Sequence, residues 1–211
     1  MENIKLICFD LDHTLITHGS WKEMGLALGI SYEEDERLYK EYASGMLTYK
    51  EWNNKVLEYY MNHPHANRTD ITRILSEYAY TDGVKEVISY LKNKGYQLAL
   101  VSGSIDILVE MVAQDLGIEH FKANNTFVFD ENDRLLQIES GEDEVMAKAE
   151  YLKDICHSLG IDIHECACIA DGANDEEMFR ITGHGVTFKG SPITLSAWKI
   201  ITTLNDIKNI L

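Results

Sequence analysis

The sequence has 211 residues, of which 45% are hydrophobic and 26% charged, as in a globular protein with a substantial core. Its length suits one full domain carrying a smaller insert, and no apolar run approaches the ~18 residues of a membrane span. The 35 acidic residues outnumber the 19 basic ones, for a formal net charge of −16. This balance argues against nucleic acid and anionic membranes as partners, because both bind through clustered cations. A small anionic substrate is compatible with it if a local cation or metal offsets the field.

The first segment, MENIKLICFDLDHT, has an acid at residue 2 and no Ala-x-Ala cleavage pattern. It lacks the features of a signal peptide, and we therefore expect a cytoplasmic protein. In that compartment cysteines are expected to be reduced and, by type, buried. The four cysteines are Cys8, Cys156, Cys166 and Cys168. Nothing in the sequence specifies an oligomeric state.

Short apolar runs along the chain predict buried parallel strands. They are Lys5–Phe9, Gln97–Val101, Cys166–Ala170 and, more weakly, Gly185–Phe188. Apolar residues spaced three and four apart predict helices between them, at Val84–Leu91, Ile105–Leu116 and Met146–Leu159. Strands that alternate with helices predict an α/β fold, a Rossmann-like parallel sheet covered on both faces.

Residues 16–78 break this alternation, because they contain no convincing buried strand. Their helical patterns, rich in Tyr, Trp and charge, are Trp21–Leu28, Tyr32–Ala43, Tyr49–Met61 and Thr69–Glu77. A helical insert after the first strand predicts a small cap domain, residues 16–78, on a core domain made of residues 1–15 and 79–211. Farther along, two apolar runs around a polar turn predict a hairpin; these runs are Thr126–Phe129 and Leu135–Ile138.

Two acids, Asp10 and Asp12, directly follow the first predicted strand, and Thr14 comes two residues later. Open α/β sheets bind ligands at this edge. A carboxylate there is suited to act as a nucleophile, and a neighbouring carboxylic acid can exchange protons with the leaving group and with water. Two hard oxygen ligands also suit Mg²⁺. The same residues are equally typical of a polar turn that caps a helix.

Ser102 and Gly103 end the next predicted strand, where a hydroxyl and free N–H groups at a helix start would form an anion site or an ordinary N-cap. Lys148 lies near the start of a later helix. A helical lysine is usually solvated, but an acidic nucleophile beside a phosphate needs a fixed positive charge.

Asp171 follows the CACIA strand and would deliver a third carboxylate to the same edge, completing an oxygen-rich Mg²⁺ site. Asn174 is placed to contact substrate or water, and Asp175 to hold Lys148. An acidic loop on an acidic protein is the alternative. All four motifs fall at or near predicted strand ends or a helix start, and this shared placement favours a catalytic site.

On these four motifs the sequence resembles the haloacid dehalogenase superfamily of phosphatases, and within it the phosphoserine phosphatase branch. The resemblance implies that Asp10 is the nucleophile and Asp12 the general acid–base. It implies that Mg²⁺ is held by Asp10, Asp171 and the backbone carbonyl of Asp12. The roles it implies are phosphoryl binding by Ser102, Gly103 and Lys148, substrate contact by Asn174, and support of Lys148 by Asp175. Thr14 is a further supporting residue of the site.

Two positions depart from that branch. Gly19 stands where the branch carries a Glu that binds the substrate's amino group, and Asn54 stands where it carries a carboxylate-binding Arg. Lys50 and Lys55 are near, but neither supplies a bidentate guanidinium fork. The resemblance therefore predicts the chemistry and leaves serine specificity open.

The sequence thus predicts a Mg²⁺-dependent phosphatase that hydrolyses a small phosphorylated metabolite through an aspartyl-phosphate intermediate. One alternative is a phosphotransferase, in which an alcohol takes the phosphoryl group from Asp10. Another is a non-catalytic binding module with the same fold, although such a module has no need of both Asp10 and Asp12.

Overall fold

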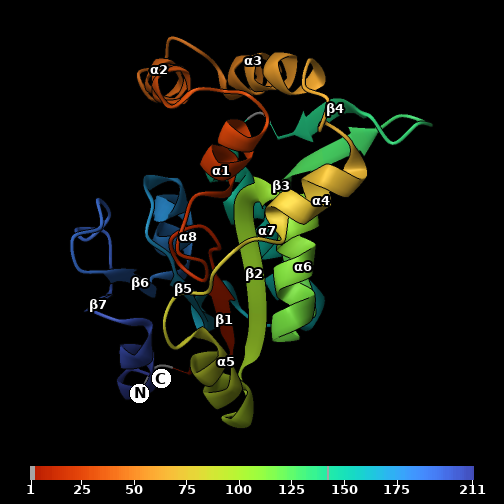
Figure 1. The fold of residues 1–211 in the computed structure, drawn as a ribbon. Coiled ribbons are helices and arrows are strands. Elements are labelled where there is room, and N and C mark those ends of the chain that lie inside the picture. Colours follow the sequence, from red (N-terminus) through yellow and green to blue (C-terminus); the bar gives the residue numbers. More distant parts are fainter. Residues whose placement is uncertain (1–2, 142) are drawn as a thin grey trace.

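The computed structural model describes residues 3–141 and 143–211 (Figure 1). Within them a seven-stranded sheet has the order β4-β3-β2-β1-β5-β6-β7. Its strands are β1 (Leu6–Phe9), β2 (Gln97–Ile105), β3 (His120–Phe129), β4 (Leu135–Ser140), β5 (Cys166–Ile169), β6 (Gly185–Phe188) and β7 (Lys199–Ile201). All neighbouring strands are parallel except β3 and β4.

The central strand β1 pairs with β2 on one side and β5 on the other. Phe9, its last residue, is opposite Leu100 and Ile169 in the two ladders. Residues that follow β1, β5 and this part of β2 consequently meet at the same edge of the sheet. The backbone N–H of Asp10 continues this alignment by donating to the carbonyl of Ile169 at 3.0 Å.

Strand β1 is apolar along its whole length because both sheet faces are covered, as expected for a parallel sheet. Its side chains alternate between two cores: Ile7 and Phe9 pack in the larger cluster, and Leu6 and Cys8 in the smaller one. All four cysteines belong to the smaller cluster, where they are buried and free of disulfides, as predicted.

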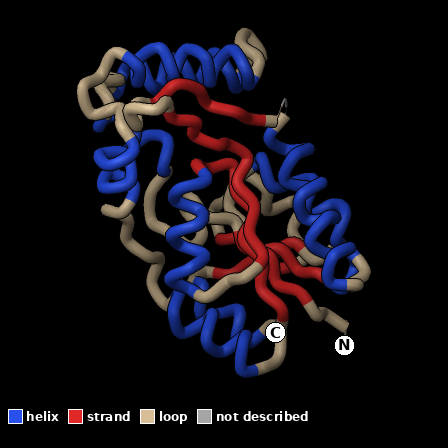
Figure 2. Tube along the Cα trace, turned by 90° about the vertical axis from the view of Figure 1, so that its right-hand side faces the viewer, coloured by secondary structure: helices blue, strands red, loops and turns tan. Residues whose placement is uncertain are grey.

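Eight α-helices accompany the sheet in the described part of the chain (Figure 2). They are α1 (Ser20–Ala27), α2 (Tyr32–Ala43), α3 (Tyr49–Met61), α4 (Arg68–Leu75), α5 (Val84–Asn93), α6 (Asp106–Leu116), α7 (Glu144–Leu159) and α8 (Glu176–Thr182). Three short 3₁₀ segments are η1 (Ile163–Glu165), η2 (Ala173–Asp175) and η3 (Leu204–Asn209). None of these helices is both long and apolar enough to cross a bilayer.

The ends of the helices follow local sequence signals. Helix α3 begins with a capping box, in which the Thr48 side chain accepts from the N–H of Glu51 and the Glu51 side chain accepts from the N–H of Thr48. Helices α6 and α7 end at Gly117 and Gly160, whose φ angles of 60° and 66° favour glycine.

Helices α1 to α4 lie between β1 and β2 in sequence. They correspond to the four helices predicted for residues 16–78. In Figure 1, α2 and α3 lie at the top of the molecule, and α3 runs close to β4. Asn53 on α3 connects the helical insert to the sheet, because its side-chain amide donates to the hydroxyl of Ser140 on β4 at 2.9 Å. The exact domain boundaries, at residues 15 and 78, stay a prediction.

The structure differs from the sequence-based elements in three places. Strand β2 continues to Ile105, so Ser102 and Gly103 lie in the strand and not at a helix start. The predicted hairpin exists, but β3 begins at His120 because its first half pairs with β2. Strand β7 was not predicted; its three residues include two that are exposed, which weakens the apolar signal.

Leu152 tests the core beneath α7, because its side chain is fully buried in the smaller cluster. Replacing it with Ala should lower the free energy of unfolding by ~2–5 kcal/mol, since the cavity forfeits packing as well as transfer energy. The adjacent Lys153 pairs with Glu150 only at the surface, so Lys153→Ala should change stability by less than about 0.5 kcal/mol. Urea denaturation of both variants measures the difference.

Candidate active site

Asp10 begins the site at the end of β1, with only 5% of its surface exposed. A tight turn follows it, in which the carbonyl of Leu11 accepts from the N–H groups of Thr14, Leu15 and Ile16 at 3.2, 2.9 and 3.0 Å. This turn keeps Asp12 and Thr14 at the sheet edge beside Asp10.

Lys148, on α7, is the cation of the site and has no exposed surface. Its Nζ donates to Oδ1 of Asp10 at 2.7 Å and forms a second ion pair with Asp175. Burial by itself would lower the pKa of Lys148, but the carboxylates of Asp10 and Asp175 outweigh it and raise that pKa. The ammonium is therefore charged at neutral pH and lies against Asp10.

Three carboxylates converge at this point. Asp10, Asp171 and Asp175 each have an oxygen within 4.8 Å of the others. Burial, with a further contribution from Asp10, raises the pKa of Asp171 to about 6. Because hard carboxylate oxygens are the ligands that divalent cations such as Mg²⁺ prefer, the donor set fits such an ion.

The loop that carries Asp171 is held from two sides. The Thr14 hydroxyl donates to Oδ1 of Asp171 at 3.4 Å, and the Ser191 hydroxyl donates to its backbone carbonyl at 2.6 Å. Farther along the loop, Oδ2 of Asp175 accepts from the N–H of Gly172 at 3.2 Å.

Asp12 is held by Ser20, the first residue of α1. The N–H and hydroxyl of Ser20 donate to the two carboxyl oxygens at 3.0 and 2.8 Å. These bonds favour ionisation, but burial and the nearby charge of Asp10 dominate and raise the pKa of Asp12 to about 7. Asp12 can therefore hold or release a proton near neutral pH.

Ser102 and Gly103 occupy the irregular end of β2, where pairing with β3 shifts register. The Ser102 hydroxyl accepts from the N–H of Ser104 at 3.0 Å. The carbonyl of Gly103 accepts from Trp21 Nε1 at 3.1 Å and from Asn125 Nδ2 at 2.7 Å. Contacts with α1 and β3 therefore hold this segment in position. The sequence had instead suggested that Ser102 and Gly103 lie at the N-terminus of a helix, which is wrong.

A cavity of ≈180 Å³ joins these groups. The described residues that line it are Asp10, Asp12, Trp21, Tyr39, Tyr42, Tyr49, Trp52, Ser102, Gly103, Glu144 and Asn174. Asn174 Nδ2 donates to Oε1 of Glu144 at 2.6 Å. A Cβ added to Gly103 would overlap that same oxygen, so a larger residue at position 103 would displace the Glu144 carboxyl from the strand end.

The family model of haloacid dehalogenase-like hydrolases matches residues 7–180 of this chain. The chain belongs to that family. Phosphoserine phosphatase of Methanocaldococcus jannaschii is 31% identical over 208 residues, which cover 98% of this chain and 96% of the relative. Phosphoserine phosphatase of Campylobacter jejuni subsp. doylei is 28% identical and covers 99% of this chain and 98% of its own length.

Two solved structures share the whole fold. A phospho-aspartyl intermediate analogue of phosphoserine phosphatase has a TM-score of 0.83 at 28% identity, covering 99% of both chains. A substrate-bound phosphoserine phosphatase complex has the same TM-score and identity and covers 100% of both chains. These matches confirm the predicted family and fold and support a phosphoric monoester hydrolase.

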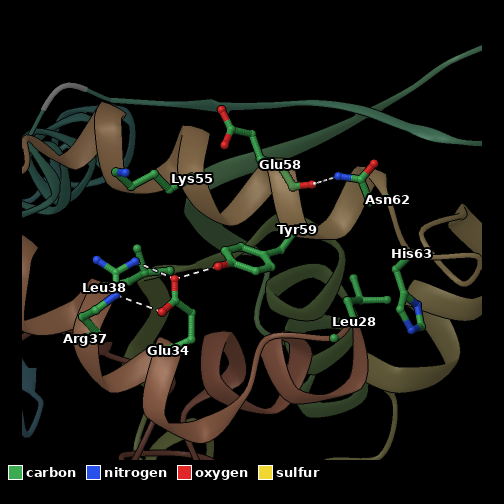
Figure 3. A pocket seen from close by; sticks show the side chains of 10 residues that line it. Leu28, Glu34, Arg37, Leu38, Lys55, Glu58, Tyr59, Asn62 and His63 are labelled. Carbon is green, nitrogen blue, oxygen red and sulfur yellow. Dashed lines mark hydrogen bonds and ion pairs between the residues drawn. The ribbon is translucent and has the colours of Figure 1, made fainter.

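The described residues that line this hydrolase's first cavity do not include Asn54, Lys50 or Lys55. Asn54 and Lys50 are exposed on α3. Lys55 lines a second cavity of ≈460 Å³ between α2 and α3 (Figure 3). Polar groups of that cavity pair with one another: Arg37 Nε and the Tyr59 hydroxyl donate to Glu34 at 2.8 and 2.6 Å.

Three residues of this hydrolase were not predicted from the sequence although they contact the predicted site: Ser20, Asn125 and Glu144. Each is an ordinary residue in an ordinary helix or strand. Asn125, for example, lies 22 positions from Gly103. No local spacing marks such contacts, because only the packing of α1, β3 and α7 around the sheet edge creates them.

Replacing Lys148 with Met should lower the free energy of unfolding of the metal-free protein by ~3–5 kcal/mol, because buried carboxylates lose their counter-charge. Adding Asp175→Asn to this variant should recover part of the loss, since Asp175 is itself fully buried. Denaturant titrations in chelator measure both. Equal instability of single and double variants would contradict the ion-pair argument.

The raised pKa of Asp12 predicts that the stability of the metal-free protein depends on pH. Its pKa is about 7 when folded and ~3.9 when unfolded, so between these values the folded state holds a proton that the unfolded state releases. The contribution of Asp12 to stability therefore falls as pH rises through this window, by up to ~1.4 kcal/mol per pH unit. Asp12→Asn should gain stability relative to the parent as pH rises from about 4 to 7.

Denaturant titrations across that window test this expectation. Asp154, exposed on α7, provides the matched control, and Asp154→Asn should follow the parent at every pH. A stability difference between Asp12→Asn and the parent that does not vary with pH would contradict the argument.

Proposed function

We propose that this chain hydrolyses small phosphomonoesters in two steps, with Asp10 as the nucleophile. The observation that carries the proposal is the contact between Asp10 and the buried ammonium of Lys148, inside a cavity that also contains Asp12 and Ser102. The names of the two relatives reported above, both phosphoserine phosphatases, support the same activity.

In the first step an oxygen of Asp10 attacks phosphorus and the ester oxygen leaves as the alcohol. Asp12, whose pKa of about 7 favours a protonated carboxyl below neutrality, supplies the proton that the alkoxide takes. Lys148 and the segment at Ser102 and Gly103 stabilise the charge on the phosphoryl oxygens. This step leaves the phosphoryl group covalently attached to Asp10 as an aspartyl-phosphate intermediate.

In the second step water attacks the phosphorus of this intermediate. Asp12, now ionised, takes the proton from the water, and Asp10 leaves as the carboxylate. Inorganic phosphate is released and both acids return to their initial states. The Ser20 bonds to Asp12 keep one carboxyl orientation available for both proton transfers.

We propose Mg²⁺ as the divalent ion, held by the side chains of Asp10 and Asp171 and the backbone carbonyl of Asp12. Asp175 is assigned to Lys148, with which it is ion-paired, and not to the metal. When bound, the ion neutralises phosphoryl charge and orients the phosphate. Thr14 keeps Asp171 in position, and Asn174 is assigned to the substrate side of the cavity.

The substrate proposed here is a small phosphorylated metabolite, and the cytoplasm is the proposed compartment. A phosphotransferase and a non-catalytic module are not favoured by the hydrolase family match. Release of phosphate in the presence of added alcohol separates hydrolysis from transfer.

Asp10→Asn should lower kcat for 4-nitrophenyl phosphate on the order of 10³-fold or more, because the amide is not a nucleophile. Acid-quenched parent enzyme should carry a phosphoryl group on Asp10 by peptide mass spectrometry, and the variant should carry none. Activity should be lost in chelator and restored better by Mg²⁺ than by the larger Ca²⁺. A fully active Asp10→Asn variant would refute the assignment.

A further inference from the structure

The cavity that contains Asp10 is lined on its cap side by aromatic rings. Trp21 comes from α1, Tyr42 from α2, and Tyr49 and Trp52 from α3. The ring centroids of Trp21 and Trp52 are 5.1 Å apart with planes at 70°, and those of Tyr42 and Tyr49 are 5.6 Å apart at 57°. We call these four residues the aromatic cage.

Rings in several planes present more than one face to an occupant of the cavity. A cation within ~6 Å of a ring centroid is attracted by the ring's electron-rich face, and most strongly by Trp. The cation–ring contacts found among the described residues use rings outside the cage, such as Lys22 over Tyr32 at 4.3 Å. No cation from the described residues therefore occupies the cage, in which Tyr49 and Trp52 stack on each other with centroids 5.8 Å apart and planes at 24°.

Glu144 adds negative charge to the same cavity. It is the first residue of α7, and one of its carboxyl oxygens accepts from Asn174. Lys148, one helical turn farther along α7, forms its ion pairs with Asp10 and Asp175. Burial raises the pKa of Glu144 and the charge of Lys148 lowers it, so a substrate cation would add to the counter-charge that Lys148 already supplies.

A carboxylate on the substrate's alcohol would meet the opposite situation. The charged side chains among the described lining residues are Asp10, Asp12 and Glu144, all of them acids. A buried carboxylate beside them would have no guanidinium or ammonium partner except Lys148, which already contacts Asp10. The cavity thus disfavours phosphoserine, which carries such a group.

From these contacts we infer that the leaving alcohol is a small quaternary ammonium alcohol without a carboxylate, bound between the aromatic cage and Glu144. The inference rests on the proposed phosphatase function. A quaternary ammonium has no N–H donors and is bound well by ring faces alone. The cavity of ≈180 Å³ is below the ~300–1,000 Å³ of pockets for drug-sized ligands, so the head group must be small.

Three esters test the inference on the Mg²⁺-loaded parent enzyme: phosphocholine, 3,3-dimethylbutyl phosphate and phosphoserine. The second has the shape of phosphocholine, with carbon in place of the charged nitrogen. We expect kcat/KM for phosphocholine to exceed that for the carbon analogue at least ~10-fold, because only the cation interacts with ring faces and Glu144. Phosphoserine should be the poorest of the three.

Two variants locate the effect. Glu144→Gln keeps the shape of the side chain and removes its charge, and Tyr42→Leu removes one ring of the cage. In each variant, the ratio of kcat/KM for phosphocholine to kcat/KM for the carbon analogue should move toward one. Glu58→Gln, on α3 but lining the second cavity, is the matched control and should keep the parent ratio. Thermal unfolding of each variant shows whether it is folded.

The outcomes separate the inference from the function on which it rests. Equal kcat/KM for phosphocholine and its carbon analogue, or a preference for phosphoserine, would overturn the inference and leave the phosphatase function intact. A parent ratio retained in folded Glu144→Gln and Tyr42→Leu would also overturn it. If the parent hydrolyses none of these three esters and does not hydrolyse 4-nitrophenyl phosphate either, the proposed function itself is overturned.

Discussion

A lysine ammonium with no exposed surface organises the centre of this protein. Burying a charge is unfavourable unless it is paired, and Lys148 pairs with both Asp10 and Asp175. Asp10 lies at the end of β1, Asp175 in η2 after β5, and Lys148 on α7, so the ion pairs join three segments. Stability and chemistry therefore depend on the same contacts.

Around this centre, the core and the insert between β1 and β2 contribute different groups. The sheet edge supplies the carboxylates, whereas the insert supplies the aromatic cage and Ser20, which holds Asp12. Trp21 links the two by donating to the carbonyl of Gly103. The groups proposed for chemistry thus come mainly from the sheet edge, and those proposed for substrate selection come mainly from the insert.

The sequence predicted that acids after two strands would lie at the same edge of the sheet, because strand ends can be located from apolar runs. Asp10 and Asp171 follow β1 and β5, which are neighbours in a parallel sheet, and their carboxylates do converge. The prediction that Ser102 lies where β2 ends and a helix begins was wrong. Strand β2 continues past Ser102, because the pairing with β3 extends to Ile105. Strand β7 was missed because two of its three residues are exposed.

By itself the sequence determined the α/β class, the helical insert and the family, because apolar periodicity and short motifs are local properties of the chain. Only the tertiary structure decided which distant residues line the cavity beside Asp10. Glu144 and Trp52 are 92 positions apart by residue number yet line the same cavity. Their proximity follows from how α3 and α7 pack against the end of the sheet, and no spacing along the chain encodes it.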